Sequence, residues 1–122
     1  DLEDCSNQPI GTLSGSAAHD LMKARLFTNI VTYDGQIEPY QDLRNGRVNA
    51  VLLDVPIAVY NTTGKPEFKP VGKLEGWGGY GIALRRDDDE LAKAVDDALA
   101  TIAKAGKVDE IVRKWNIWNA EQ

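Results

Sequence analysis

The chain has 122 residues, 43% of them hydrophobic, which is enough apolar material for the core of one globular domain. Fourteen basic residues against nineteen acidic ones leave a net charge of -5, and no Lys/Arg cluster follows the spacing of a phosphate backbone, so nucleic acid is not an expected partner. Its apolar stretches are all broken well short of the roughly 20 residues that span a bilayer.

A single cysteine, Cys5, and a single histidine, His19, limit the metal and redox chemistry of the chain. One cysteine cannot form an internal disulfide, and one histidine cannot supply a His-rich metal site. We therefore predict no bound metal and no cofactor. No charged-then-apolar leader opens the sequence, so a signal peptide is expected to lie outside these residues.

Short apolar runs alternate with helical patterns, as is typical of βα units and of a mainly parallel sheet. The sequence therefore predicts an α/β fold, an open sheet flanked by helices. Gly46 is expected to stop the second helix, and Pro56 suits the first turn of the third. In chain order the predicted elements are a strand over 9–13, a helix over 17–24, a strand over 29–33, a helix over 38–45, a strand over 48–53, a helix from 56 through 60, and strands over 68–71 and 80–84.

The C-terminal part of the chain has a different pattern. Apolar side chains recur at helical spacing after the acidic run 87–90, which stands where a helix N-terminus favours negative charge. Gly106 is expected to end this helix, and a shorter one follows. The apolar faces of the two helices need a covering surface. Their apolar positions are Leu91, Val95, Leu99, Ile102, Val108, Ile111, Val112 and Trp115.

Asp54 interrupts an apolar run at the predicted end of the third strand. In an open α/β sheet, ligands bind beyond the carboxyl ends of the strands, and the loop Ser14-Gly15-Ser16 follows the first strand in the same way. If these two strands are neighbours, a helix N-terminus with free N–H groups lies beside a carboxylate. A free α-amino acid would satisfy both, its carboxylate on the N–H groups and near Ser16, its ammonium on Asp54. The alternative hypothesis is that Asp54 only caps the following helix.

Two other motifs are weaker. The run Gly76-Trp77-Gly78-Gly79-Tyr80-Gly81 formally satisfies the dinucleotide pattern G-x-G-x-x-G, but it leads into a predicted strand where that pattern requires a helix. A flexible hinge is the favoured interpretation. A Ser/His/Asp hydrolase built from Ser14 or Ser16 with His19 and Asp54 lacks the G-x-S-x-G elbow.

The chain resembles the family 3 extracellular solute-binding proteins, the polar amino-acid receptors of bacterial ABC transporters. Three stretches carry the resemblance: "IGTLSGSAAHDL", "DLRNGRVNAVLLDVPIAVY" and "YGIALRRDDDELAKAVDDALATIAKAGKVDEIVRKWNIW". It implies a two-lobed, type II periplasmic-binding fold, with 1–79 as the second lobe and 80–122 as a return strand and closing helices that belong to the first lobe. The ending "WNIWN" is also similar to receptor domains fused ahead of amino-acid permeases.

The same resemblance implies the ligand-binding residues. It places Ser14, Gly15, Ser16 and Ala17 at the substrate carboxylate and side chain, and Asp54 at the α-ammonium. Ala17 stands where many members carry Thr, so a contact there must come from its backbone N–H. His19 stands where an acidic residue is common and is expected to face solvent.

Nothing in the chain resembles the N-terminal portion of the first lobe, which in the family supplies an aromatic wall and the Arg that holds the substrate carboxylate. The implied function is a non-catalytic receptor that binds a free polar amino acid and delivers it to an ABC permease on the periplasmic or extracellular face of a bacterial membrane. Two alternatives stay open, an enzyme of the cyclohexadienyl-dehydratase type and a permease-fused or sensor domain. Because the closing helices lack their usual cover, we expect either that they fold back on the sheet or that two chains pair through them, and pairing is the favoured alternative.

Overall fold

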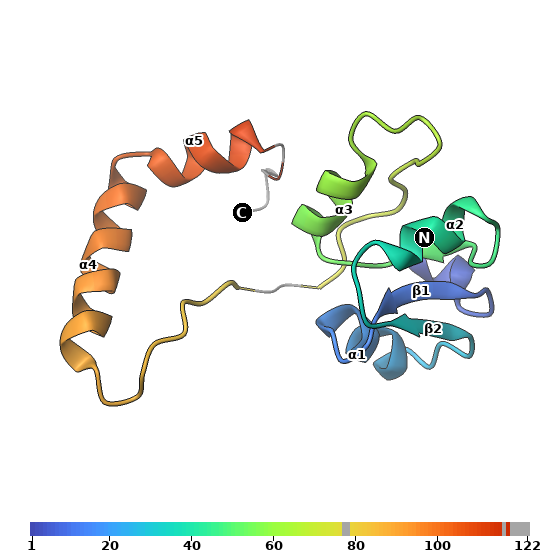
Figure 1. Cartoon of the computed structure of the whole chain (residues 1–122), viewed down its shortest axis with the longest axis horizontal. Helices are drawn as coiled ribbons and strands as arrows, with labels where there is room; N and C mark the ends of the chain where they lie inside the picture. Colours follow the sequence, from blue (N-terminus) through green and yellow to red (C-terminus); the bar gives the residue numbers. More distant parts are fainter. Residues whose placement is uncertain (77–78, 116, 118–122) are drawn as a thin grey trace. The chain divides into compact units, whose positions relative to one another are not determined.

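The computed structural model describes residues 1–76, 79–115 and 117 of the chain (Figure 1). The chain divides into two compact units, Asp1–Gly76 and Trp77–Gln122. Two positions of the glycine-rich run, Trp77 and Gly78, lie outside the described residues, as do Asn116 and 118–122 of the closing sequence.

The first unit alternates strands and helices, as the apolar pattern predicts. A 3₁₀ helix precedes the first strand and was not predicted. Each predicted helix of this unit is found within one or two residues of its expected bounds. The elements are the 3₁₀ helix Leu2–Cys5, β1 Ile10–Leu13, α1 Ala17–Ala24, β2 Ile30–Tyr33, α2 Glu38–Arg44, β3 Ala50–Val51 and α3 Val55–Thr62.

In the described part of this unit, three parallel strands form a sheet in the order β2-β1-β3. Ile10 of β1 is in register with Ile30 on one side and with Ala50 on the other. The first and third strands are therefore neighbours, as the ligand-site hypothesis requires. Because parallel strands end at the same edge of a sheet, the segments after β1 and β3 emerge together.

The alternation of β1 residues explains how both faces of the sheet are covered. Ile10 packs with Met22 and Phe27 in the buried core on the α1 side. The next residue, Gly11, faces the other way, where a Cβ would lie 3.3 Å from the Cβ of Pro39 in α2. Glycine suits this position, because a Cβ would also lie 3.1 Å from the Tyr33 ring and would force its neighbours to shift.

Three strand predictions need correction. The third strand spans Ala50–Val51, shorter than 48–53; beyond its C-terminal end the Thr12 hydroxyl, not a backbone N–H, donates to the Leu52 carbonyl at 2.8 Å. The predictions of strands over 68–71 and 80–84 are wrong. Pro70 has no N–H to give a ladder, and no described segment pairs with either stretch, so neither can become a strand.

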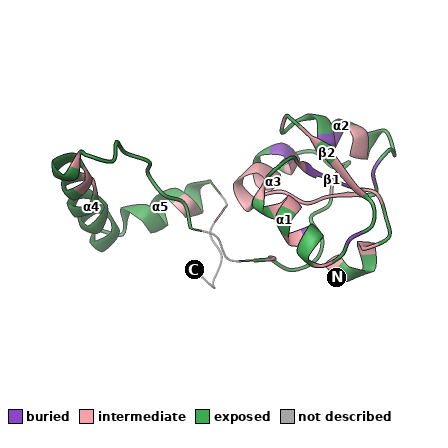
Figure 2. Ribbon diagram, turned by 90° about the horizontal axis from the view of Figure 1, so that it is seen from below, coloured by how far each residue is buried: buried purple, intermediate pink, exposed green. Residues whose placement is uncertain are grey.

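In the second unit, α4 (Asp89–Lys104) and α5 (Lys107–Lys114) confirm the predicted helices. Asp88 caps α4 by accepting the Leu91 N–H at 3.2 Å, and Gly106 separates the helices with φ of 70°. Both helices are largely exposed (Figure 2). The described helices are all too short or too polar to cross a membrane.

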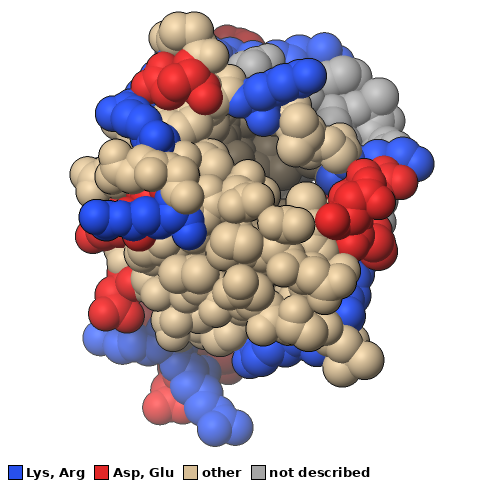
Figure 3. All heavy atoms as spheres, turned by 90° about the vertical axis from the view of Figure 1, so that its right-hand side faces the viewer, with Lys and Arg blue, Asp and Glu red and all other residues tan. Residues whose placement is uncertain are grey.

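Acidic and basic side chains are interspersed around the surface. Figure 3 shows them surrounding an uncharged area on one face of the molecule. Within the first unit, Arg47 pairs with Asp42 at 3.0 Å and Lys23 with Asp20 at 2.7 Å. Part of the described charge is thus neutralised locally, through mostly exposed pairs that contribute little stability each.

Candidate functional site

The loop after β1 turns sharply at Gly15, whose φ is 67°, a left-handed value that glycine adopts without strain. The Ser14 N–H donates to the Tyr33 carbonyl at 2.9 Å, which ties the loop to the end of β2. The Ser16 N–H donates to the Leu13 carbonyl at 3.3 Å and closes the turn. The loop is therefore held in one shape by backbone bonds, with the exposed side chain of Ser14 at its tip.

Ser16 is the N-cap of α1. Its hydroxyl oxygen accepts the His19 N–H at 3.1 Å, while its proton is donated to the Leu13 carbonyl at 2.9 Å. The Ser16 hydroxyl is thus engaged both as a donor and as an acceptor. Ser16 therefore sets the direction of the helix N-terminus.

His19 does more than the solvent-facing role that the sequence predicts, and that prediction is corrected here. It is partly buried, and its Nδ1 accepts the Gly15 N–H at 3.1 Å. The imidazole thus takes one of the backbone donors expected for a ligand. Since Ser16 directs its proton to Leu13, the described geometry contains no Ser16–His19 catalytic pair.

The first two residues of α1, Ala17 and Ala18, present backbone N–H groups that have no intrahelical partner. No described group accepts from either of them. Together with the positive end of the helix dipole they form a place for an anion. Ala17 was predicted from the sequence, whereas Ala18 was missed; its position as the second helical residue was the available signal.

Thr12 links the two strand ends and was also missed by sequence reasoning. It is fully buried, at 0% exposure. Its hydroxyl donates to Leu52, just after β3, and lies 3.4 Å from the Ser16 hydroxyl at the start of α1. One signal in the sequence indicated Thr12, a polar residue near the end of a strand that is otherwise apolar. It holds the loop after β1 against the segment that leads to Asp54.

Asp54 stands at the N-cap position of α3, but its side chain makes no capping hydrogen bond. Its backbone carbonyl accepts the Ala58 N–H at 3.0 Å, and Pro56 occupies the first turn. The carboxylate is exposed, and among the described residues it has no ion-pair or hydrogen-bond partner. It is therefore available to a cation from solution.

The sheet edge thus carries opposite charges on neighbouring strand ends. Helix α1 offers N–H groups for an anion, and the segment after β3 offers a carboxylate for a cation. No group of three or more potential metal ligands occurs among the described residues. This arrangement suits a ligand that carries both charges.

Comparisons with known proteins agree with this chemistry. No protein-family model matches the chain. It is 29% identical over 116 residues to the L-cystine-binding protein TcyJ of Escherichia coli (strain K12), covering 93% of this chain and 43% of that protein. It is 28% identical over 130 residues to the lysine/arginine/ornithine-binding periplasmic protein of the same organism, covering 97% and 50%.

Solved structures show the same similarity. An ancestral arginine-binding protein bound to glutamine matches with a TM-score of 0.80 at 30% identity, covering 96% of this chain and 53% of that one. A mutant of ArgBP from T. maritima matches with a TM-score of 0.79 at 25% identity, covering 93% and 49%. The chain therefore shares the periplasmic-binding-protein fold, which confirms the predicted fold class.

The homologues of the chain are family 3 amino-acid-binding periplasmic proteins, and the resemblance stated from the sequence is confirmed. All of those named here are binding proteins, none an enzyme. The chain spans about half the length of the relatives it matches.

Proposed function

We propose that the chain is part of a solute-binding receptor that recognises a free polar amino acid for ABC-type transport. The observation that carries the proposal is the pair of neighbouring strand ends, one with unbonded N–H groups at Ala17 and Ala18, the other with the unbonded carboxylate of Asp54. The names of its homologues, which describe amino-acid-binding proteins, support the proposal.

Each site residue has a distinct role in this proposal. The ligand carboxylate lies on the N–H groups that begin α1, with the Ser14 hydroxyl beside it. Its ammonium pairs with Asp54. Gly15 and Ser16 shape the loop, because the Gly15 N–H and both capacities of the Ser16 hydroxyl have protein partners.

The lobe assignment belongs to the same proposal. Residues 1–79 form the second lobe, and 80–122 belong to the first lobe, whose remaining part supplies the opposite wall of the cleft. The partner is an ABC permease, and the location is the periplasmic or extracellular face of a bacterial membrane. The periplasmic names of relatives support this location.

We infer a non-catalytic role. Acid–base catalysis needs a group within hydrogen-bond reach of a reacting proton. In the loop after β1, the hydroxyl of Ser16 and the imidazole of His19 are each engaged with backbone groups. Asp54 is the remaining ionisable group of the site, and this proposal assigns it to the ligand ammonium.

The test is an NMR titration of the 122-residue chain with L-glutamine and with glutaramate, its deaminated analogue. Half of a cleft gives weak binding, which we expect at millimolar concentrations or above, so amide chemical shifts are the suitable readout. Amides of 14–18 should shift more with glutamine than with glutaramate. Asp54→Asn should remove that preference, because losing one member of a hydrogen-bonded ion pair costs ~2–5 kcal/mol when the pair is desolvated.

Asp96→Asn, an equal loss of charge on exposed α4, is the matched control and should keep the preference. Denaturant melting of Asp54→Asn should show a change of about 1 kcal/mol or less, since the Asp54 side chain has no capping hydrogen bond to lose. A preference for glutamine that survives Asp54→Asn would refute the assignment of the ammonium site.

A further inference from the structure

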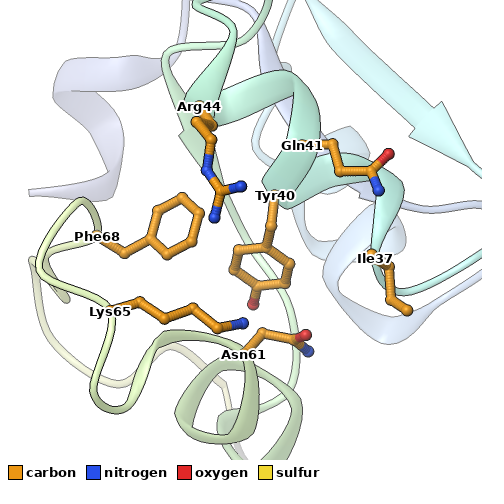
Figure 4. A pocket seen from close by; sticks show the side chains of 7 residues that line it. All are labelled: Ile37, Tyr40, Gln41, Arg44, Asn61, Lys65 and Phe68. Atoms are coloured by element: carbon orange, nitrogen blue, oxygen red, sulfur yellow. The ribbon is translucent and has the colours of Figure 1, made fainter.

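A cavity of about 190 Å³ lies along α2, within the first unit (Figure 4). None of its lining residues belongs to the proposed amino-acid site. Three segments build it, so its shape depends on the packing of α2 against the end of α3 and the loop that follows. Its main lining residues are Tyr40, Gln41 and Arg44 from α2, Asn61 from α3, and Lys65 and Phe68 from the loop.

Tyr40 supplies a hydrogen-bond donor to this cavity. The residue is 7% exposed, and its ring packs edge-on against Phe68 at 5.6 Å. No described group bonds its hydroxyl, and that hydroxyl is not sealed from solvent. Burial raises the pKa of Tyr40 to about 12, so the phenol keeps its proton at neutral pH. A buried phenol usually finds a partner, and here the free direction is the cavity.

The walls carry more positive than negative charge. Arg44 lies over the Phe68 ring at 5.6 Å and is paired with Glu67, so its charge is largely matched. Lys65 has no ion-pair partner among the described residues. In Figure 4 its ammonium end and the Tyr40 oxygen point toward the same space. The Asn61 amide donates to the Ile57 carbonyl at 2.9 Å, which fixes the adjoining wall.

We propose that this cavity binds a small organic carboxylate that carries no ammonium group. The Tyr40 hydroxyl and the Lys65 ammonium both donate to the carboxylate, a charge-assisted arrangement. The Phe68 ring and the exposed Ile37 side chain contact a short apolar body. An ammonium on the ligand would meet the Lys65 charge, which disfavours an α-amino acid. The cavity therefore selects a different class of ligand from the proposed amino-acid site.

The test is an NMR titration of the whole chain with butyrate at constant ionic strength, with n-butylamine as the probe of opposite charge. Butyrate should give saturable shifts of the amides around Tyr40, Asn61 and Lys65, and n-butylamine none. Lys65→Gln and Tyr40→Phe should each weaken binding by at least about tenfold, as expected for losing a hydrogen bond to a charged group. Lys69→Gln, an exposed lysine of the same loop outside the cavity, is the matched control.

The proposal is overturned if the butyrate shifts do not saturate, if Lys65→Gln and Lys69→Gln bind alike, or if inorganic phosphate binds the same amides as tightly, which would make the cavity a general anion trap. Because Tyr40 is buried, Lys65→Gln decides the matter if Tyr40→Phe does not fold. Failure here leaves the amino-acid site unaffected, since the two titrations report on different amides.

Discussion

A single side chain, that of His19, changes which backbone N–H groups at the start of α1 are without a partner. His19 is the third residue of α1, where a capping box would place Glu or Gln against the N-cap N–H. Its imidazole reaches one residue further back, to Gly15. Among the described residues, the N–H groups of Ala17 and Ala18 therefore remain without a partner, whereas that of Gly15 does not. The ligand site that we propose is placed on these two N–H groups for that reason.

Two tyrosines should make the stability of the first unit sensitive to alkali. Burial, with the Asp42 hydrogen bond at 2.9 Å, raises the pKa of Tyr33 to about 12, and burial does the same for Tyr40. An unfolded tyrosine ionises near pH 10, so unfolding releases protons above that pH. The stabilisation is complete below pH 10 and should be lost as the pH rises toward 12.

The measurement is urea unfolding followed by circular dichroism at several pH values from 8 to 12. Tyr40→Phe should flatten the alkaline decline, because a phenyl ring has no proton to lose. Tyr60→Phe, at a side chain that is 78% exposed, serves as the control. Equal pH profiles for Tyr40→Phe and Tyr60→Phe would contradict the prediction.

At the scale of elements, α1 and α2 end in the same way with different residues. In both, the residue after the C-cap is left-handed, Leu26 with φ of 59° and Gly46 with φ of 71°. In both, the N–H of the following residue donates to a carbonyl five residues back, Phe27 to Met22 and Arg47 to Asp42. This is the Schellman motif, and it brings Phe27 onto Met22 in the core.

Leu26→Gly should therefore stabilise the chain. Leu26 is 83% exposed, so little packing is lost, whereas a left-handed leucine costs about 1–2 kcal/mol. Allowing for the extra freedom of unfolded glycine, we expect a gain of about 0.5–1 kcal/mol in unfolding free energy. Gly46→Leu, at the equivalent position with open space around it, should destabilise. Denaturant melts of both variants check the pair, and a change of the same sign in both would refute the argument.

At the scale of the whole molecule, the two units differ in how far they bury their apolar surface. The first has a covered sheet, and Arg25 at the end of α1 bonds both Glu3 and Glu75, near the two ends of that unit, at 2.8 and 2.7 Å. In the second unit the described apolar side chains remain partly or largely exposed, including Leu99 at 42% and Trp115 at 60%. We propose that two chains pair through α4 and α5.

The expected result is a mass that rises with concentration toward two chains in size-exclusion chromatography with light scattering. Burying one such side chain is worth ~1.5–3 kcal/mol, so Leu99→Gln with Ile102→Gln should shift the protein to one chain. Ala100→Gln, on the opposite side of α4 by helical spacing, should leave the mass unchanged. A one-chain mass for the unmutated protein at every concentration would rule the pairing out.

The sequence by itself determined the helices, the first two strands and the order of βα units, because their signals are local: apolar runs, Gly46 after a helix, Asp88 and Ser16 before one. It also placed Asp54 between the third strand and the third helix, although the strand ends at Val51, earlier than predicted. Only the tertiary structure decided which groups stay unbonded there, since that depends on partners distant in sequence, such as Thr12 with Leu52. For the same reason the predictions of strands over 68–71 and 80–84 were wrong. A strand forms only where another segment pairs with it, and the local sequence does not reveal that partner.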